Sequence, residues 1–133
     1  MNEVTLAIIK PDAYKNGVSG KIIDRIISEE FIINEMKQIH LSKKMAEGFY
    51  EIHRERPFFD ELTSFMSSGK SIVLSLEREN AVSKWRDVIG ATNPAEAVAG
   101  TIRGQFGTNT GNNAVHGSDS PENGKLESKY FFS

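Results

Sequence analysis

The 133-residue sequence predicts an α+β fold of the ferredoxin-like, split βαβ sandwich type, a four-stranded antiparallel sheet with helices packed against one face. Two observations indicate this class. Short apolar runs alternate along the chain with segments whose apolar residues recur at helical spacing. The order of these segments is β-α-β-αα-β-α-β-α, within a length that suits a single domain over residues 1–133. Such a fold hosts many activities, so the function has to be inferred from the sites.

Four segments have the character of strands. Residues 4–9 form a short, continuous apolar run that stops at Pro11. Extended character returns over residues 31–41. Residues 71–76 include a β-branched pair, which argues against a helix. The fourth strand is expected around residues 114–116.

Apolar residues at helical spacing predict the first three helices. One helix, with Ser19 as its N-cap, carries an apolar stripe of isoleucines over residues 22–27. A second helix is expected over residues 46–52, and a third follows Pro57 and includes residues 62–66.

The second half of the chain is predicted to contain two more helices and a long loop. The helix over residues 81–89 ends at Gly90, a residue that favours helix C-termini. Residues 93–113 are rich in Gly and Thr and lack periodicity, which is typical of functional loops. A closing helix is expected over residues 120–131, with Asp119 as its cap.

Composition and charge exclude several kinds of protein. Cysteine is absent, which rules out disulfides, thiolate nucleophiles and cysteine-ligated metals. The net charge of −2 does not indicate a strongly basic protein that would bind a nucleic acid or an anionic membrane. The first apolar run is too short for a signal peptide, and no segment approaches the length needed to span a membrane. We therefore expect a cytoplasmic protein with no membrane partner and no obligatory nucleic acid.

Three cationic residues are candidates for binding anions. Lys10 closes an apolar strand, where its ammonium group must reach solvent or meet an anion. Arg103 lies in residues 100–104, whose glycines are expected to let the backbone approach a ligand closely. A guanidinium group also suits bidentate binding of phosphate. Arg86, taken alone, has the character of a solvated residue on a helix face.

Phe58 and Phe59 follow Pro57 between two predicted helices. One of the two rings is expected in the core. The other could lie at the surface and stack on a nucleic acid base, an interaction with little base preference.

His116 is one of three histidines and lies in a polar stretch, residues 112–120. Gly117 next to it is expected to leave its ring uncrowded. A carboxylate such as Glu127 on the closing helix could bind one ring nitrogen and leave the other free to attack. No second histidine or carboxylate lies at metal-ligand spacing. On these residues alone, a nucleophile and a histidine in a surface turn both remain open.

Residues 113–120 resemble the active-site signature of the nucleoside diphosphate kinases. The resemblance covers essentially the whole chain, because five further blocks match that family in order: residues 9–12, 47–50, 56–59, 90–94 and 100–103. In the family, a histidine takes a phosphate from a nucleoside triphosphate, mainly ATP, and passes it to a nucleoside diphosphate by a ping-pong mechanism. This reaction maintains nucleoside triphosphate pools.

The resemblance implies a role for each matching residue. His116 would be the nucleophile, Glu127 would orient it, and Ser118 would contact the surroundings of the ring. Lys10, Tyr50 and Asn113 would lie beside the transferring phosphate or the sugar hydroxyls. Phe58 would stack on the base. The phosphates would be held by His53, Arg56, Arg86, Thr92 and Arg103.

The resemblance also implies a cofactor and partners. Mg²⁺ would arrive with the nucleotide phosphates and be held mainly by phosphates and water, since no acidic cluster for a protein metal site is evident. Residues 93–113 would form contacts in a homo-oligomer. The sequence ends at Ser133, without the extension of longer members, so a dimer, tetramer or hexamer remains open. Asn112 replaces an arginine frequent in the family, a change expected to affect assembly or stability more than chemistry.

A non-catalytic ferredoxin-like module that binds nucleotide or RNA is the alternative. RNA-binding versions place aromatic residues on central strands within a basic patch. Here the predicted strands are aliphatic and the net charge is negative.

Overall fold

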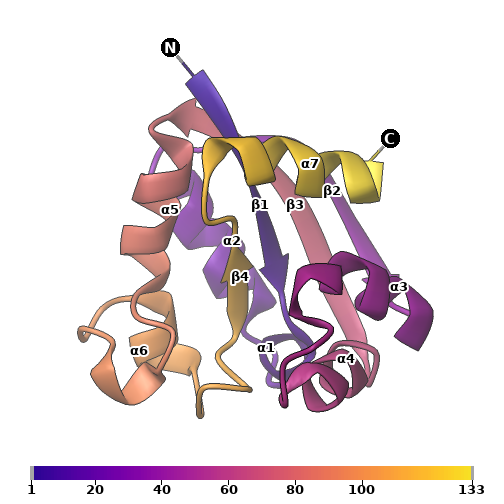
Figure 1. Ribbon diagram of the computed structural model, residues 1–133. Helices are drawn as coiled ribbons and strands as arrows, with labels where there is room; N and C mark the ends of the chain where they lie inside the picture. Colours follow the sequence, from indigo (N-terminus) through magenta and orange to yellow (C-terminus); the bar gives the residue numbers. More distant parts are fainter. Residues whose placement is uncertain (1, 133) are drawn as a thin grey trace.

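The computed structural model describes residues 2–132, and its four strands form one antiparallel sheet in the order β2-β3-β1-β4 (Figure 1). The strands are β1 (Asn2–Ile9), β2 (Ile32–His40), β3 (Lys70–Glu79) and β4 (Val115–Gly117). The predicted α+β fold with a split βαβ arrangement is therefore confirmed.

The described residues form more helices than the sequence predicts. They are α1 (Pro11–Lys15), α2 (Ser19–Ser28), α3 (Lys43–Phe49), α4 (Phe59–Met66), α5 (Ala81–Ile89), α6 (Ile102–Phe106) and α7 (Pro121–Phe132), with the 3₁₀ turns η1 (Glu51–His53) and η2 (Pro94–Glu96). The sequence did not predict α1, and it predicted a loop where η2 and α6 lie. Helices of three to five residues are too short to show an apolar repeat. No helix within residues 2–132 is long and apolar enough to cross a membrane.

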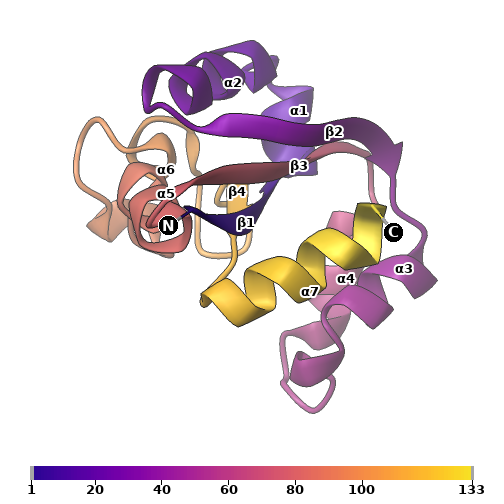
Figure 2. The same cartoon turned by 90° about the horizontal axis from the view of Figure 1, so that it is seen from above.

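Helices cover both faces of the sheet, so the prediction that they pack on one face was wrong. Consecutive residues of β1 point to opposite faces. Ala7 and Ile9 pack with the buried side chains of α2 and α5, whereas Leu6 and Ile8 pack with those of α3, α4 and α7. Figure 2 shows α2 on one side of the sheet and α7, α3 and α4 on the other. Burial on both faces explains why the first strand is continuously apolar.

The covered faces also argue against the RNA-binding alternative. That mode of binding needs aromatic side chains displayed on open central strands. The central strands β1 and β3 instead bury aliphatic side chains such as Leu6, Leu74 and Leu76. The sheet therefore offers no open central face to a nucleic acid within the described residues.

Two predicted helix caps differ by one residue from the structure. Ser19 lies inside α2, after the N-cap residue Val18, and its buried hydroxyl has no partner among residues 2–132. Asp119 does not cap α7, because the hydroxyl of Ser120 accepts the backbone N–H of Asn123 at 3.1 Å. Prediction of a cap from residue type alone cannot separate neighbouring polar residues.

The predicted end of α5 at Gly90 is confirmed. Gly90 has a φ of 89°, in the left-handed region that favours glycine. A Cβ at this position would also lie 2.6 Å from the hydroxyl oxygen of Thr101. The turn after Gly90 carries the chain from α5 toward the cleft described below.

Candidate active site

A cleft of about 640 Å³ gathers Lys10, which follows β1, with residues from the α3–α4 region, α5, α6, β4 and α7. Ten of the twelve site residues predicted from the sequence line it. These ten residues are Lys10, Tyr50, His53, Phe58, Arg86, Thr92, Arg103, Asn113, His116 and Glu127.

The two remaining predicted residues lie elsewhere. Ser118 is fully buried beneath the cleft and bonds to Glu127. Arg56 is exposed in the turn between η1 and α4 and is not among the residues that line the cleft. Its N–H donates to the carbonyl of His53 (2.8 Å), and its own carbonyl accepts from Phe59 (3.0 Å). This tight turn presents Phe58 to the cleft and leaves the Arg56 side chain outside it.

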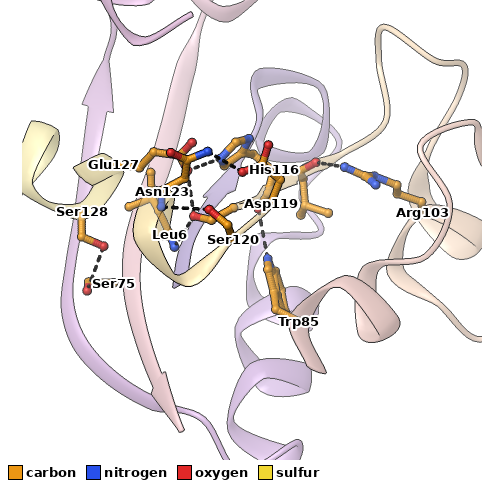
Figure 3. Close-up of polar contacts among 12 residues, drawn as sticks. Leu6, Ser75, Trp85, Arg103, His116, Asp119, Ser120, Asn123, Glu127 and Ser128 are labelled. Carbon is orange, nitrogen blue, oxygen red and sulfur yellow. Dashed lines mark hydrogen bonds and ion pairs between the residues drawn. The ribbon is translucent and has the colours of Figure 1, made fainter. Parts of the chain in front are cut away.

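His116 is held by a carboxylate on α7 (Figure 3). Its Nε2 lies 2.8 Å from Oε1 of Glu127, and the Ser118 hydroxyl donates to the same oxygen at 2.7 Å. Ser118 in turn accepts the backbone N–H of Leu6 at 3.0 Å, which ties the group to β1. Because a carboxylate only accepts hydrogen bonds, Nε2 carries the proton of a neutral ring. The lone pair of His116 is then on Nδ1.

Gly117 has a packing reason that the sequence did not reveal. A Cβ at this position would lie 2.7 Å from Cδ1 of Trp85, a fully buried side chain on α5. The Trp85 indole N–H donates to the carbonyl of His116 at 3.0 Å (Figure 3). Because residue 117 has no side chain, the Trp85 indole can pack against the backbone next to His116. This packing is a second reason for glycine at 117, besides the predicted open approach to the His116 ring.

The chain enters β4 through a turn centred on Ala114. Ala114 has a φ of 74°, which is uncommon for a residue other than glycine, and Val115 N–H donates to the Asn113 carbonyl at 2.9 Å, as in a γ-turn. Both backbone polar groups of Ala114 form hydrogen bonds. Its carbonyl accepts the N–H of Lys10 at 2.8 Å, and its N–H donates to Oδ2 of Asp12 at 3.1 Å.

Lys10 projects from this junction into the cleft. Its Nζ donates to Oδ1 of Asn113 at 2.9 Å, and the side-chain amide of Asn113 donates to the Thr92 carbonyl at 3.0 Å. Burial, and then the positive charge of Arg103, together lower the pKa of Lys10 to about 8, although the Asp12 carboxylate opposes the shift. An anion in the cleft would restore its charge.

Arg103 is mostly buried and donates to two carbonyls, that of Gly90 at 3.0 Å and that of Val115 at 2.9 Å. Its buried Nε has no partner among residues 2–132. Burial and the nearby Arg86 lower the pKa of Arg103 to about 10. The guanidinium group is thus rigidly placed, with donor capacity left for an anion.

The two glycines beside Arg103 differ in the space around them. A Cβ at Gly104 would lie 2.5 Å from the Val98 carbonyl oxygen, inside the same turn. Gly100, with a φ of 94°, makes the turn before α6. Gly104 therefore shapes the loop, whereas an added Cβ at Gly100 would meet no described atom within 4 Å, and close approach of a ligand there stays a prediction.

Tyr50 and Phe49 form the wall of the cleft opposite Arg103. The buried Tyr50 hydroxyl has no partner among the described residues. Burial, and then the Glu127 carboxylate, raise the pKa of Tyr50, so its phenol keeps its proton. Phe49 packs partly buried against the core, and its ring makes a T-shaped contact with the His116 ring, with centroids 5.3 Å apart and planes at 73°. Only the three-dimensional fold reveals this contact.

Phe58 and His53 stand at the mouth of the cleft. The Phe58 side chain is 47% exposed, whereas that of Phe59 is buried, as expected for such a pair. The rings of His53 and Phe58 have centroids 5.6 Å apart. An exposed ring held in this way is suited to stacking on a planar base.

The loop before β4 completes the rim. Asn112 lines the cleft, and its carbonyl accepts the N–H of Thr108 at 2.8 Å, which closes the loop on itself. No group of three or more His, Cys, Asp or Glu side chains within residues 2–132 could hold a metal ion. The cleft instead gathers Lys10, Arg86 and Arg103, which suits a polyphosphate that brings its own Mg²⁺.

Comparison with known proteins agrees with this arrangement. The protein-family model described as nucleoside diphosphate kinase matches residues 3–133 of this chain. The chain belongs to the nucleoside diphosphate kinase family. It is therefore a member of an enzyme family of phosphotransferases that act on nucleotides.

Curated relatives match over nearly their full length. The nucleoside diphosphate kinase of Geotalea daltonii is 57% identical over 131 residues, which cover 98% of this chain and 96% of that protein. The enzyme of Campylobacter jejuni is 58% identical over 130 residues, with 98% and 95% covered.

Solved structures of nucleoside diphosphate kinases share the whole fold. That of Aquifex aeolicus superposes with a TM-score of 0.97 at 48% identity, covering 100% of this chain and 96% of that one. The halophilic enzyme of Halobacterium salinarum, solved in complex with CDP, gives a TM-score of 0.95 at 32% identity, with 100% and 89% covered.

Proposed function

We propose that this protein transfers the γ-phosphate of a nucleoside triphosphate, mainly ATP, to a nucleoside diphosphate through a phosphohistidine on His116. The observation that carries the proposal is the pairing of His116 Nε2 with Glu127 inside a cleft lined by Lys10, Arg86 and Arg103. This pairing leaves the Nδ1 lone pair available as a nucleophile.

The reaction proceeds in two half-reactions. In the first, Nδ1 forms a bond to the γ-phosphorus while the bond from that phosphorus to the β–γ bridging oxygen breaks, and the diphosphate leaves. In the second, an oxygen of the acceptor's terminal phosphate attacks the same phosphorus, and the Nδ1–P bond breaks. The proton on Nε2 stays on the ring throughout, and the Glu127 carboxylate that accepts it in a hydrogen bond balances the positive charge of the phosphorylated ring.

The cleft residues position the phosphoryl group and compensate its charge. Lys10 and Arg103 are fixed by hydrogen bonds before a ligand arrives, so little reorganisation is needed. The Tyr50 hydroxyl and Arg103 Nε, which have no partner within residues 2–132, supply two further donors. Mg²⁺ carried by the nucleotide would neutralise phosphate charge. Phe58 would stack on the base, and His53, whose ring lies beside Phe58, would contact the phosphates.

The wider setting follows from the family. We propose that the protein acts as a homo-oligomer in the cytoplasm, where this reaction would maintain nucleoside triphosphate pools. The CDP complex of the relative from Halobacterium salinarum supports binding of a nucleoside diphosphate in this cleft.

The test is to incubate the protein with γ-³²P-labelled ATP, with and without a nucleoside diphosphate. Without acceptor, the label should remain on the protein in a bond that acid breaks and alkali does not. With acceptor, the label should pass to the new triphosphate.

Two variants separate the candidate nucleophiles. His116→Ala should abolish labelling, whereas His40→Ala should retain it, because the His40 ring bonds the Ser67 carbonyl at 2.8 Å, outside the cleft. An acid-stable label, or one that persists in His116→Ala, would move the nucleophile to a serine such as Ser118 or Ser120. Nucleotide binding without any label would favour a non-catalytic module.

A further inference from the structure

The last helix touches α3 through a side chain outside the cleft. The Tyr130 hydroxyl on α7 donates to the Met45 carbonyl on α3 at 2.9 Å. The same hydroxyl lies against Gly48, where an added Cβ would approach it to 2.5 Å. Gly48 therefore leaves the space that the tyrosine oxygen uses to reach the α3 backbone.

Helix α3 leads directly into the wall of the cleft. Phe49 and Tyr50 lie at its end, and His53 follows in η1. The Phe49 ring packs between the His116 ring and the aromatic rings of α7, with centroid distances of 5.3 Å to His116 and 5.8 Å to Tyr130. Any shift of α3 relative to α7 would move this wall relative to the histidine.

Helix α7 thus contacts both sides of the cleft. Glu127 bonds His116, and Tyr130, three residues later, bonds α3. Figure 2 shows α7 running alongside α3 and α4 on the same side of the sheet. One rigid helix fixes the nucleophile and the opposing wall at a set separation.

We propose that Tyr130 is a positioning residue for nucleotide binding, which sets the place of His53, and of the Phe58 ring beside it, relative to His116. The inference rests on the proposed function. Loss of the Tyr130 hydrogen bond should weaken nucleotide binding and leave the phosphoryl transfer step unchanged, because the bond between Glu127 and His116 is independent of it.

Tyr130→Phe removes the hydroxyl and keeps the ring. The KM for both nucleotides should rise roughly two- to tenfold, the range expected for one hydrogen bond, with kcat within about twofold of wild type. Tyr14→Phe is the matched control, since its hydroxyl donates to Gln38 Oε1 at 2.9 Å away from the cleft. A Tyr130→Phe protein with an unchanged KM, or with a loss confined to kcat, would overturn the inference.

A second pair of variants tests the contact with Gly48. In Gly48→Ala the new methyl group must displace the Tyr130 hydroxyl, so KM should rise. In the double variant Gly48→Ala/Tyr130→Phe the nearest ring atom is Cζ, at 3.5 Å, which is an ordinary contact. Adding Gly48→Ala to Tyr130→Phe should therefore not raise KM further. An equal effect of Gly48→Ala in both backgrounds would contradict the proposed contact.

Direct binding of ADP, measured by calorimetry, keeps the two proposals apart. If wild-type protein binds ADP but forms no phosphoenzyme, the proposed function fails. Binding by Tyr130→Phe should still be weaker than by Tyr14→Phe in that case, and equal binding by the two would overturn the role of Tyr130.

Discussion

The indole of Trp85 occupies the space that a side chain at Gly117 would need, 2.7 Å from the position of its Cβ. Trp85 also donates a hydrogen bond to the carbonyl of the preceding residue, His116. A large core side chain thus holds the backbone of the proposed nucleophile in place.

Gly117→Ala should therefore destabilise the protein by about 1–3 kcal/mol, the usual cost of overpacking a core, and slow formation of the phosphoenzyme. Urea unfolding would measure the first effect, and single-turnover labelling the second. Gly20→Ala is the control, because a Cβ there meets no atom within 4 Å and α2 favours alanine by up to about 1 kcal/mol. Equal stability of the two variants would show that the indole tolerates the methyl group.

Arg103→Ala should lower kcat/KM by about 10²–10³, the loss typical of removing one donor to transition-state charge. It should also cost stability, because the Gly90 and Val115 carbonyls lose their partner. Arg25→Ala is a matched control, since Arg25 also donates to a loop carbonyl, that of Gly100, but lies outside the cleft. We expect the control to lose stability only. Wild-type kinetics in folded Arg103→Ala would refute the phosphate assignment.

The low pKa of Lys10 makes nucleotide binding dependent on pH. As the pH rises through about 8, the ammonium group loses its proton, and kcat/KM of the free enzyme should fall. Asp12→Asn removes the negative charge that raises the pKa of Lys10, so the fall in kcat/KM should begin at a lower pH. The same fall should be absent in Lys10→Ala. A fall at the same pH in all three proteins would assign it to another group.

The same shift affects stability with a definite sign. The pKa of Lys10 lies below its ordinary value of 10.5, so between pH 8 and 10.5 the unfolded chain binds this proton more tightly. Its contribution to the free energy of unfolding therefore rises with pH across that window. Urea unfolding of wild-type and Lys10→Met proteins at several pH values would measure the difference.

Phe58 should confer affinity without base selectivity. Stacking contributes about 1–3 kcal/mol per base, so Phe58→Ala should raise KM by roughly 5- to 150-fold for every common nucleotide. Wild-type efficiencies for the four diphosphates should lie within about a hundredfold of each other. Inorganic tripolyphosphate, which has no base, should inhibit both proteins equally. A thousandfold preference of the wild type for one base would contradict the stacking role.

The sequence predicted the strands and long helices well because their apolar periods extend over several residues. Helices α1 and α6 have five residues each, too few for a period. The apolar run of β1 indicated a buried strand, but it could not show that Leu6 and Ala7 pack in different cores. That distinction depends on which helices cover each face.

That His116 and Lys10 would lie together was predictable from the family resemblance, whose matching blocks include both, whereas the chemistry of each residue alone left other interpretations open. The site was not predictable where the reason lies in a distant partner. Phe49 acquires its role from the ring of His116, and Gly117 from the indole of Trp85. Arg56 has suitable chemistry, but it lies exposed in a turn and is not among the residues that line the cleft.

The junction at Ala114 bears on the order in which the protein acquires its site. Residues 10 and 12, near the start of the chain, hold the turn that presents Asn113, about a hundred residues later. Such distant pairings close large loops and form late and slowly in folding. A nascent chain that has not yet reached β4 therefore lacks both the proposed nucleophile and the partner that orders Lys10, so phosphate binding should appear only after β4 has been synthesised.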